Sequence, residues 1–374
     1  MELITKRSAP LRDEEFFIGQ DGLDIGIFKA AEADNKTVSM VLEDAKSQKE
    51  GEVSPYFGMS KYEVLQAKKA MRERGETPPL TAFEECLAKA QINPKTDMVS
   101  KFYEYSDTDV LFPEYIMDRA YSSLLQGSIV PEFTMAMTQV NSLSVQKLYL
   151  EDDEDDRQLH AVSKMEDLPE TRIEVGDQNI RLDMYGRYLM GSKIDLATAR
   201  INLIDRFLSK VGQQLAIDES DLLVYRLINC DGNSGTTPGT TATAAATGAA
   251  AISFADTLTW ATCLPAPYKM DKFVAKKTNN VAWLNRLYDG STSSIGNDVF
   301  KAFPKCIEWD RSVVTTNYFV GVDSRYSIEY FHMGGPKTEV ENLVRKVSQG
   351  LAIYHHYDFA IADNQAVATF DMTS

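Results

Sequence analysis

The stretch that decides the fold is Val347-Ser-Gln-Gly-Leu-Ala-Ile-Tyr-His-His-Tyr-Asp-Phe-Ala-Ile361, which alternates without a break. Large side chains recur at every second position on one face, and mostly small or polar ones occupy the other face. A period of two residues predicts a β-strand. Ordinary strands have about 3–10 residues, whereas this one would extend for about 50 Å. The length favours a structural building part over an enzyme. The large face comprises Val347, Gln349, Leu351, Ile353, His355, Tyr357, Phe359 and Ile361.

The composition is that of a folded protein. The 374 residues could form two ordinary domains or one elaborate one, and 44% of them are hydrophobic, which is ample for a core. No apolar run reaches the ~18 residues that span a bilayer, and the N-terminal sequence has no apolar secretory segment. The net charge of −16 argues against tight binding of nucleic acid, because phosphate affinity comes from clustered Lys and Arg.

The cysteines are widely spaced and form no C-x-x-C pair. Such spacing does not suit a disulfide framework or a zinc site, so we interpret them as buried thiols in a reducing cytosol. They are Cys86, Cys230, Cys263 and Cys306.

Residues 1–100 carry scattered helix signals. Capping-box patterns predict one helix over residues 60–74, closed by Gly75, and a second that begins after Thr81 and ends near Asn93. Prolines and glycines separate these signals. We therefore expect an extended arm with short helices, and a small helical domain is the alternative.

Two predicted β segments, 143–150 and 171–185, flank a run of acids. Six like charges cannot pack in a core, so Glu151-Asp152-Asp153-Glu154-Asp155-Asp156 should form the solvated tip of a long hairpin. The run could also bind a divalent cation. It lacks the glycine and the spacing of a calcium loop, so we favour the solvated tip. Before the hairpin, residues 111–125 are predicted to form a helix with Pro113 in its first turn.

The clearest helix is predicted over residues 195–216, where apolar residues recur at spacings of three, four and seven. Asp218 is predicted to cap a second helix that ends at Gly232. Leu351, Ile353, Phe359 and Ile361 of the long strand should pack against the first helix, leaving the opposite face to solvent or a neighbour. The apolar stripe comprises Leu196, Leu203, Ile204, Phe207, Leu208, Val211 and Leu215.

The remaining segments give weaker signals. The low-complexity stretch 232–251 is expected to be a flexible loop, and residues 278–288 are expected to be helical. Residues 318–331 alternate and should pair antiparallel with the long strand. A capping-box pattern at Thr338-Glu-Val-Glu341 predicts a short helix before that strand.

The sequence contains no recognised catalytic or phosphate-binding motif. G-x-x-x-x-G-K-[ST], G-x-G-x-x-G, G-x-S-x-G and H-E-x-x-H are all absent. His355 and His356 are adjacent on a strand and face opposite sides, so they cannot chelate one metal together. Cys263 or Cys306 would need a histidine partner to act as a nucleophile, and the sequence indicates none. We therefore assign no catalytic, cofactor-binding or metal-binding residue, and we expect no cofactor.

A resemblance appears when the elements are taken in order. Phe319-Val-Gly-Val-Asp323, Ile328-Glu329, Tyr357-Asp-Phe-Ala-Ile-Ala-Asp363 and Ala366-Val367 resemble the C-terminal pattern of tailed-bacteriophage major capsid proteins of the Hong Kong 97-type fold. The arm, the hairpin, the long helix and the closing strand follow the order of that family. The resemblance covers about residues 105–374.

The resemblance implies an α+β fold with named parts. They are an N-terminal arm (1–110), the start of the peripheral domain (111–140), the extended-loop hairpin (141–185), the spine helix of the peripheral domain (186–232), the axial α/β domain (233–330) and the long closing strands of the peripheral domain (331–374). Some members begin with a cleaved helical scaffolding segment, but glycine and proline breaks replace sustained heptads here. We therefore expect an uncleaved arm that lies on neighbouring subunits.

Some members also form Lys–Asn cross-links between subunits. Lys147 and Lys164 lie in the hairpin region and Asn364 lies near the end of the chain, but no motif fixes either partner. We predict no covalent cross-link.

The resemblance also implies a function. The chain would self-assemble into hexamers and pentamers of an icosahedral shell around phage double-stranded DNA, in a virion assembled in the host cytoplasm. Its partners would be further copies, reached through the hairpin and the arm, a portal protein, and a scaffold or decoration protein, with packaged DNA contacted only weakly and no membrane. One alternative is an encapsulin-like nanocompartment shell. Another is an unrecognised cytosolic enzyme.

Overall fold

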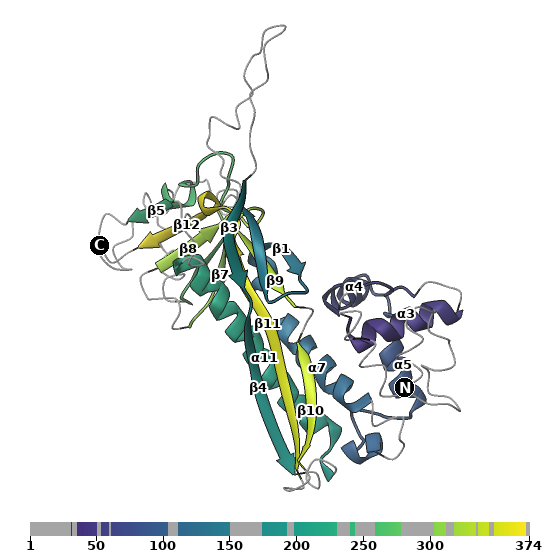
Figure 1. The fold of residues 1–374 in the computed structure, drawn as a ribbon. Helices are drawn as coiled ribbons and strands as arrows, with labels where there is room; N and C mark the ends of the chain where they lie inside the picture. The colour runs from purple at the N-terminus through teal and green to yellow at the C-terminus, as the bar shows by residue number, and fades with distance from the viewer. Residues whose placement is uncertain are drawn as a thin grey trace. The chain divides into compact units, whose positions relative to one another are not determined.

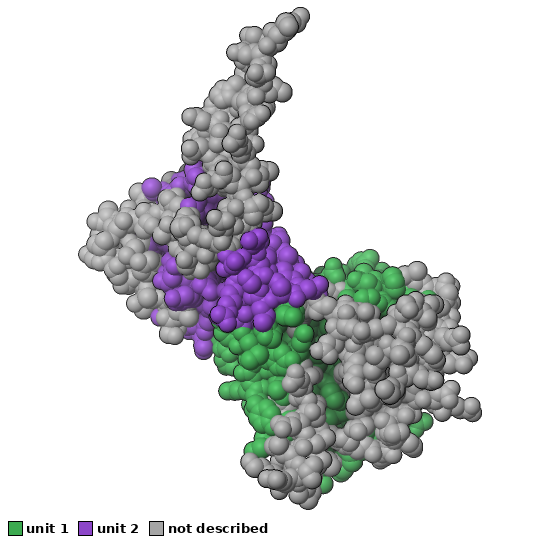
Figure 2. Space-filling view, viewed as in Figure 1, with its two compact units in different colours: residues 1–128, 184–218, 333–356 green, residues 129–183, 219–332, 357–374 purple. Residues whose placement is uncertain are grey.

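The computed structural model describes residues 31, 36–50, 54–59, 61–103, 111–149, 174–192, 198–229, 240–243, 259–277, 303–311, 318–333, 336–343 and 348–371. The chain divides into two compact units (Figure 2). Unit 1 comprises residues 1–128, 184–218 and 333–356, and unit 2 comprises residues 129–183, 219–332 and 357–374. Among the residues described, no helix is both long enough and apolar enough to cross a membrane.

The long strand is present as β11, Ser348–Ile361, with 14 residues. In unit 1 its first half pairs antiparallel with β10 (Lys337–Leu343), from Ser348↔Leu343 to Tyr354↔Lys337. It also pairs with β4 (Asp183–Ser192), so β11 runs between two neighbours (Figure 1). The strand predicted from the alternation is therefore confirmed.

The short helix predicted at Thr338–Glu341 is wrong, because these residues lie in β10. The capping-box pattern is a local signal, whereas each residue from 337 to 343 has a partner in β11. The ladder pairs the N–H and C=O groups along the segment, but a single helical turn would leave most of them unpaired.

The long helix is α11, Ile201–Asn229, a single helix of 29 residues that extends for about 44 Å. The predicted break at Asp218 is wrong. The predicted start at residue 195 lies outside the described residues, and α11 itself begins at Ile201. The Asp218 carboxylate caps nothing, and instead accepts a hydrogen bond of 2.7 Å from Nε2 of Gln214, one turn earlier. No glycine or proline lies between Gln213 and Asn229, so the helical backbone continues.

In unit 1, α11 lies very close to α7 (Leu111–Gly127), the helix that the sequence predicted over residues 111–125. A Cβ atom at Gly212 would be 2.1 Å from the carbonyl oxygen of Ala120 and 2.8 Å from Cβ of Ser123. Such distances exclude any side chain, so only glycine permits this approach.

One core holds unit 1 together, and it confirms that Ile353 packs with the long helix. Leu351 lies among the residues whose side chains are not described. Two members of the predicted apolar stripe differ from expectation, because Leu203 is 61% exposed and Phe207 is 51% exposed. The core members from α11, α7 and β11 are Ile201, Leu208, Val211, Leu111, Phe112, Tyr115, Ile116, Ala120 and Ile353.

Residues 36–103 form a helical layer that shares this core. Its elements are α3 (Val38–Glu50), α4 (Lys61–Glu73), α5 (Ala82–Lys89) and the 3-10 helix η2 (Val99–Tyr103). The ring centroid of Phe102 lies 5.2 Å from that of Phe112 and 5.7 Å from that of Tyr115. The expected extended arm is therefore not what these residues form, and the alternative of a small helical domain describes them better. The prolines and glycines fall between the helices, while apolar residues within α3 and α5 are buried.

The predicted helix ends in this layer are largely confirmed. Thr81 caps α5 through a capping box, accepting from the backbone N of Glu84 at 3.3 Å while the Glu84 carboxylate accepts from the backbone N of Thr81 at 2.9 Å. Gly75, with φ of 78°, follows the end of α4. The end of α5 comes at Lys89, earlier than Asn93, because Gln91 adopts φ of 55° and turns the chain.

In unit 2, β9 (Ile328–His332) lies between β1 (Thr134–Gln139) and the second half of β11. It is parallel to β1 and antiparallel to β11, with Ile361↔Ile328 and Tyr357↔His332 at the ends of the paired stretch. The predicted antiparallel partner of the long strand is thus confirmed in its second part, while the first part forms a separate strand, β8 (Tyr318–Val322).

The predicted hairpin is also present, as β2 (Ser144–Tyr149) and β3 (Glu174–Arg181). At its base, Ile180 and Leu182 are buried against Phe331 and Ala360. Ala360 lies on the face of β11 that we expected to be open, so that expectation is wrong in unit 2: the hairpin base covers the face.

A second sheet of unit 2 has the order β5-β12-β8-β6-β7. Its core is aromatic, with Trp260 fully buried among Phe273, Phe319 and Phe370 at ring-centroid distances of 5.4–5.9 Å. The strands other than β8 are β5 (Thr240–Thr243), β6 (Lys272–Ala275), β7 (Lys305–Glu308) and β12 (Val367–Asp371), and the short helices of this unit are α8 (Val130–Phe133) and η5 (Asn364–Ala366).

The flexible loop predicted for 232–251 is wrong at its centre, because β5 pairs parallel with β12 there. Three of the four β5 residues are threonines, which suit a strand, and β12 offers an edge to pair with. The acidic run 151–156 and the predicted helix 278–288 lie outside the described residues.

The contact at Gly212 leads to a stability prediction. Replacing Gly212 by Ala should destabilise the unassembled protein by about 1–3 kcal/mol through overpacking. The ~1 kcal/mol gain in helix propensity from Gly to Ala is too small to offset a clash with backbone. Urea denaturation followed by circular dichroism would measure the change.

The matched control is Gln213→Ala, at an exposed neighbouring position of the same helix, which should stay within ~0.5 kcal/mol of the original protein. A Gly212→Ala variant as stable as this control would contradict the close contact of α7 and α11.

Candidate functional site

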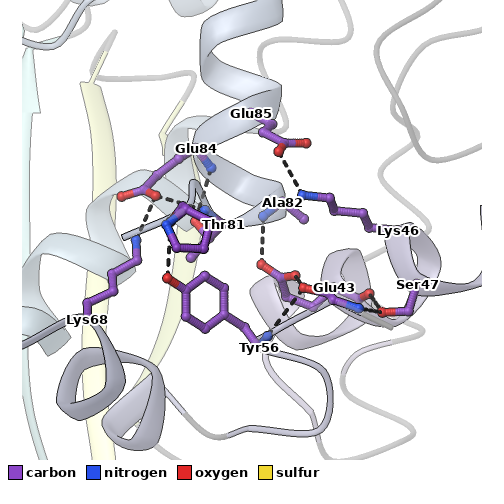
Figure 3. A network of polar contacts seen from close by, with 11 residues as sticks. Glu43, Lys46, Ser47, Tyr56, Lys68, Thr81, Ala82, Glu84 and Glu85 are labelled. Atoms are coloured by element: carbon purple, nitrogen blue, oxygen red, sulfur yellow. Dashed lines mark hydrogen bonds and ion pairs between the residues drawn. The ribbon is translucent and has the colours of Figure 1, made fainter. Parts of the chain in front are cut away.

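The helical layer of unit 1 is joined by a buried carboxylate, that of Glu43 in α3 (Figure 3). Its two oxygens accept hydrogen bonds from the backbone N of Ala82 and from the hydroxyl of Ser54, both at 2.6 Å. Ala82 is the first residue of α5, so the negative charge also lies at the positive end of that helix. Glu43 therefore fixes α3, the turn after it and α5 to one another.

Two ion pairs reinforce this arrangement. Nζ of Lys46 is 2.7 Å from Glu85, and Nζ of Lys68 is 2.7 Å from Glu84. Burial alone would raise the pKa of Glu84, but the hydrogen bonds from Lys68 and Thr81 outweigh burial and lower it. Figure 3 shows both pairs on α5, one reached from α3 and the other from α4.

A second buried ion pair joins α4 to α7. Nζ of Lys61 lies 3.0 Å from Glu114 and 3.4 Å from Asp118, and Ser39 donates a hydrogen bond of 2.5 Å to Glu114. The side chain of Glu114 is 1% exposed and that of Lys61 is 8% exposed. Burial disfavours the charged ammonium, but the two carboxylates outweigh it and raise the pKa of Lys61. The Lys61 ammonium therefore stays charged in the folded protein at neutral pH.

A cleft of about 220 Å³ lies between α3, α4, α5 and α7. Its lining carries both signs of charge. The positive residues include Lys61 and Lys68, and the negative ones are Glu43, Glu84 and Asp118. Within the described ranges, no group of three or more His, Cys, Asp or Glu residues is placed to hold a metal ion. The charges pair with one another, so we interpret the cluster as structural.

The candidate nucleophiles are placed where they are least reactive. Burial raises the pKa of Cys263 to about 11 and that of Cys306 to about 12, so both remain thiols at neutral pH. Burial likewise raises the pKa of Cys86 to about 11. On β11, His355 is buried and its neighbour His356 is partly exposed, in keeping with the expected opposite orientations.

The segment that carried the family resemblance includes a turn of unit 2 that is held by a buried carboxylate. Asp323, which is fully buried, accepts hydrogen bonds from the backbone N of Lys269 at 3.0 Å and from Nη2 of Arg325 at 2.8 Å. Burial would raise the pKa of Asp323, but the bonds from Arg325 and from the backbone outweigh burial and lower it. Asp363, also in the quoted motif, accepts a hydrogen bond from the hydroxyl of Tyr268. These residues thus hold the β8–β9 turn and the start of η5 in place.

The hairpin has few supports of its own. In the described part of the chain, β2 and β3 pair only with each other. A two-stranded sheet is marginally stable in water unless something packs on it. At its base Val145 contributes to the cluster around Ile180, so the hairpin is fixed at one end.

Large apolar side chains are exposed on two elements of unit 1. On β4 these are Met184, Tyr188 and Met190, and on α11 they are Leu203 and Phe207, with exposed fractions from 50% to 65%. Exposed apolar side chains that gather on one element commonly mark an interaction surface.

The comparisons with known proteins identify the fold and not a close relative. No protein-family model matches the chain, and no curated protein matches its sequence. Among solved structures, the capsid of a native GTA particle is similar, with 14% sequence identity and a TM-score of 0.50. The similarity covers 68% of this chain and 91% of the GTA capsid chain.

The chain has the Hong Kong 97-type capsid fold. The predicted α+β fold class and the predicted resemblance to phage major capsid proteins are thereby confirmed. A virus-like particle from Pyrococcus furiosus is also similar, at 9% identity and a TM-score of 0.47, over 70% of this chain and 99% of that chain. So is an encapsulin complex from Synechococcus elongatus, at 11% identity and a TM-score of 0.45, over 64% of this chain and 85% of that chain.

Sequence reasoning missed the ion pairs that join the helical layer to the rest of the capsid fold. A signal was present, because Glu114 stands between Phe112 and Tyr115 in the first turn of a helix whose neighbours are apolar. A charge at such a position is buried only when it is paired. Its partner Lys61 lies 53 residues away in sequence, and no periodicity connects the two.

The Lys61–Glu114 pair gives a second prediction. Lys61→Met should destabilise the protein by about 3–5 kcal/mol, because it leaves the buried carboxylate of Glu114 without its counter-charge. The double variant Lys61→Met with Glu114→Leu should recover most of that loss, since no buried charge remains. Urea denaturation measures both.

Lys69→Met is the control, since Lys69 is exposed on the same helix and its loss should cost less than ~0.5 kcal/mol. If Lys61→Met were as mild as this control, the pair would not hold the helical layer on α7.

Proposed function

We propose that this protein is the major subunit of a protein shell, and specifically a phage major capsid protein whose hexamers and pentamers enclose double-stranded DNA. The observation that supports this most is the capsid fold, whose similarity to the GTA capsid spans 91% of that chain. The long strand β11 and the long helix α11 support it too, because elements of this length suit a structural subunit.

The charge of the chain suits this role. A net charge of −16 repels phosphate, so a shell built from this subunit would not bind DNA tightly while the DNA is packaged. Packaged DNA is then contacted weakly. A portal protein, and a scaffold or decoration protein, complete the set of partners, and the location is a virion assembled in the host cytoplasm.

The parts of the chain have distinct roles in this proposal. The hairpin (141–185) reaches a neighbouring subunit, whose contacts add to the packing that β2 and β3 have at their base. The spine helix (186–232) and the closing strands (331–374) continue the peripheral domain that begins at 111–140, and residues 233–330 form the axial domain.

The N-terminal segment (1–110) stays on the assembled subunit. Its described helices share a core with Phe112 and Tyr115 of α7, so cleavage and loss of this segment would expose those aromatic side chains to water. Exposing a buried aromatic side chain costs about 1.5–3 kcal/mol.

An encapsulin-like shell is the second candidate, because an encapsulin complex is among the similar structures. The content of the particles separates the two. Particles purified from the natural source should contain protected double-stranded DNA if the chain is a capsid protein, whereas a compartment shell would contain a cargo protein and no genome.

The central prediction is that the purified protein forms closed shells of uniform size. Negative-stain electron microscopy and sedimentation velocity would both detect them. A protein that stays monomeric at high concentration, with and without a co-expressed scaffold, would contradict the proposal.

The role of residues 1–110 gives a further prediction. Intact-mass measurement of subunits from assembled particles should return the full chain. A chain that begins near residue 100 would show instead that the segment is removed.

A further inference from the structure

One surface of unit 1 has no role in the fold. Leu203 and Phe207, spaced four residues apart on α11, have exposed fractions of 61% and 51%. Arg206 and Lys210 are exposed beside them, and Arg200 is exposed just before the helix begins. Residues at spacings of three and four share one side of a helix. We call Arg200, Leu203, Arg206, Phe207 and Lys210 the α11 stripe.

The stripe is basic in a strongly acidic protein. Asp205 is the sole acid from residue 200 to residue 217, and it is already paired with Arg119 at 3.1 Å and receives a hydrogen bond from Tyr115. Within the described residues, no carboxylate forms an ion pair with Arg200, Arg206 or Lys210. Three positive charges therefore remain available on a chain whose net charge is −16.

The geometry points to an acidic protein segment as the occupant of the stripe. We infer that the α11 stripe binds Glu151-Asp152-Asp153-Glu154-Asp155-Asp156 of a second copy of this chain. This inference rests on the proposed shell function. The six acids complement the three bases, and they lie in sequence between β2 and β3, the strands that pair only with each other among the described residues.

Nucleic acid fits the stripe less well. Phosphate binding depends on the number of cations, and three bases neutralise few phosphates. Leu203 and Phe207 occupy the centre of the stripe, where a phosphate backbone gains nothing from apolar side chains. A protein segment uses both features, because its charges meet the bases and its aliphatic parts cover the apolar pair.

Each contact of this kind is weak and is screened by salt, because the Debye length is only about 8 Å at physiological ionic strength. Many copies of the contact in one shell make the sum effective. Assembly should accordingly become less favourable as salt is raised, and the α11 stripe should account for that dependence.

The first test reverses the charge of the stripe. Arg206→Glu with Lys210→Glu should raise the protein concentration needed for assembly about tenfold, the factor that corresponds to 1.4 kcal/mol. The control, Lys69→Glu with Lys95→Glu, makes the same change of charge at exposed bases outside the stripe. It should assemble like the original protein. Thermal unfolding of each unassembled variant should match the original, which shows that the variant folds.

The second test exchanges the charges. Asp152→Lys with Asp153→Lys should impair assembly alone and should restore it when combined with the reversed stripe. Failure of this combination, with the control still assembling, would overturn the inference. So would normal assembly of the reversed stripe, whether the shells are unchanged or hold less nucleic acid; the latter result would make nucleic acid the occupant.

The two proposals fail in distinguishable ways. An original protein that forms no shells contradicts the proposed function, whereas shells that are indifferent to the charge of the stripe contradict only this inference.

Discussion

The fold depends on one requirement, that the backbone of a 14-residue strand be paired along its length. Each peptide group of β11 that leaves water needs a hydrogen-bond partner. No single segment supplies them all: β10 and β4 pair with β11 in unit 1, and β9 pairs with it in unit 2. These partner strands come from three places in the sequence. Pairing the backbone groups of β11 therefore fixes much of the topology.

Sequence reasoning succeeded where a pattern extended over many residues or where all residues of a known motif were present. The alternation of β11, the capping box at Thr81 and the paired β segments of the hairpin are of that kind, and with the order of elements they were enough to predict the capsid fold. It failed where a local signal competed with distant contacts. The pattern at 338–341 predicts the start of a helix, but these residues pair with β11. Asp218 is a typical helix cap, but it lies inside the continuous helix α11.

The site could be predicted only in part. Charged groups of unit 1 form buried ion pairs with one another, and the sequence did not predict which groups would meet. Lys61 and Glu114 meet because two helices pack, and helix packing between distant segments leaves no periodicity to read. The exposure of Leu203 and Phe207 could not be predicted either, because their spacing is that of a buried apolar stripe. Only the folded structure shows which side of α11 is covered.

The core of unit 1 also bears on how the chain is made. It joins Val41 and Leu42, near the start of the sequence, to Ile353, near its end. A ribosome adds ~5–20 residues per second, so roughly 15–60 seconds separate the synthesis of those residues. The helical layer must wait for β11 before its core closes. A chain in which β11 has not yet been synthesised therefore lacks Ile353, one wall of the core that residues of α3 and α5 enter.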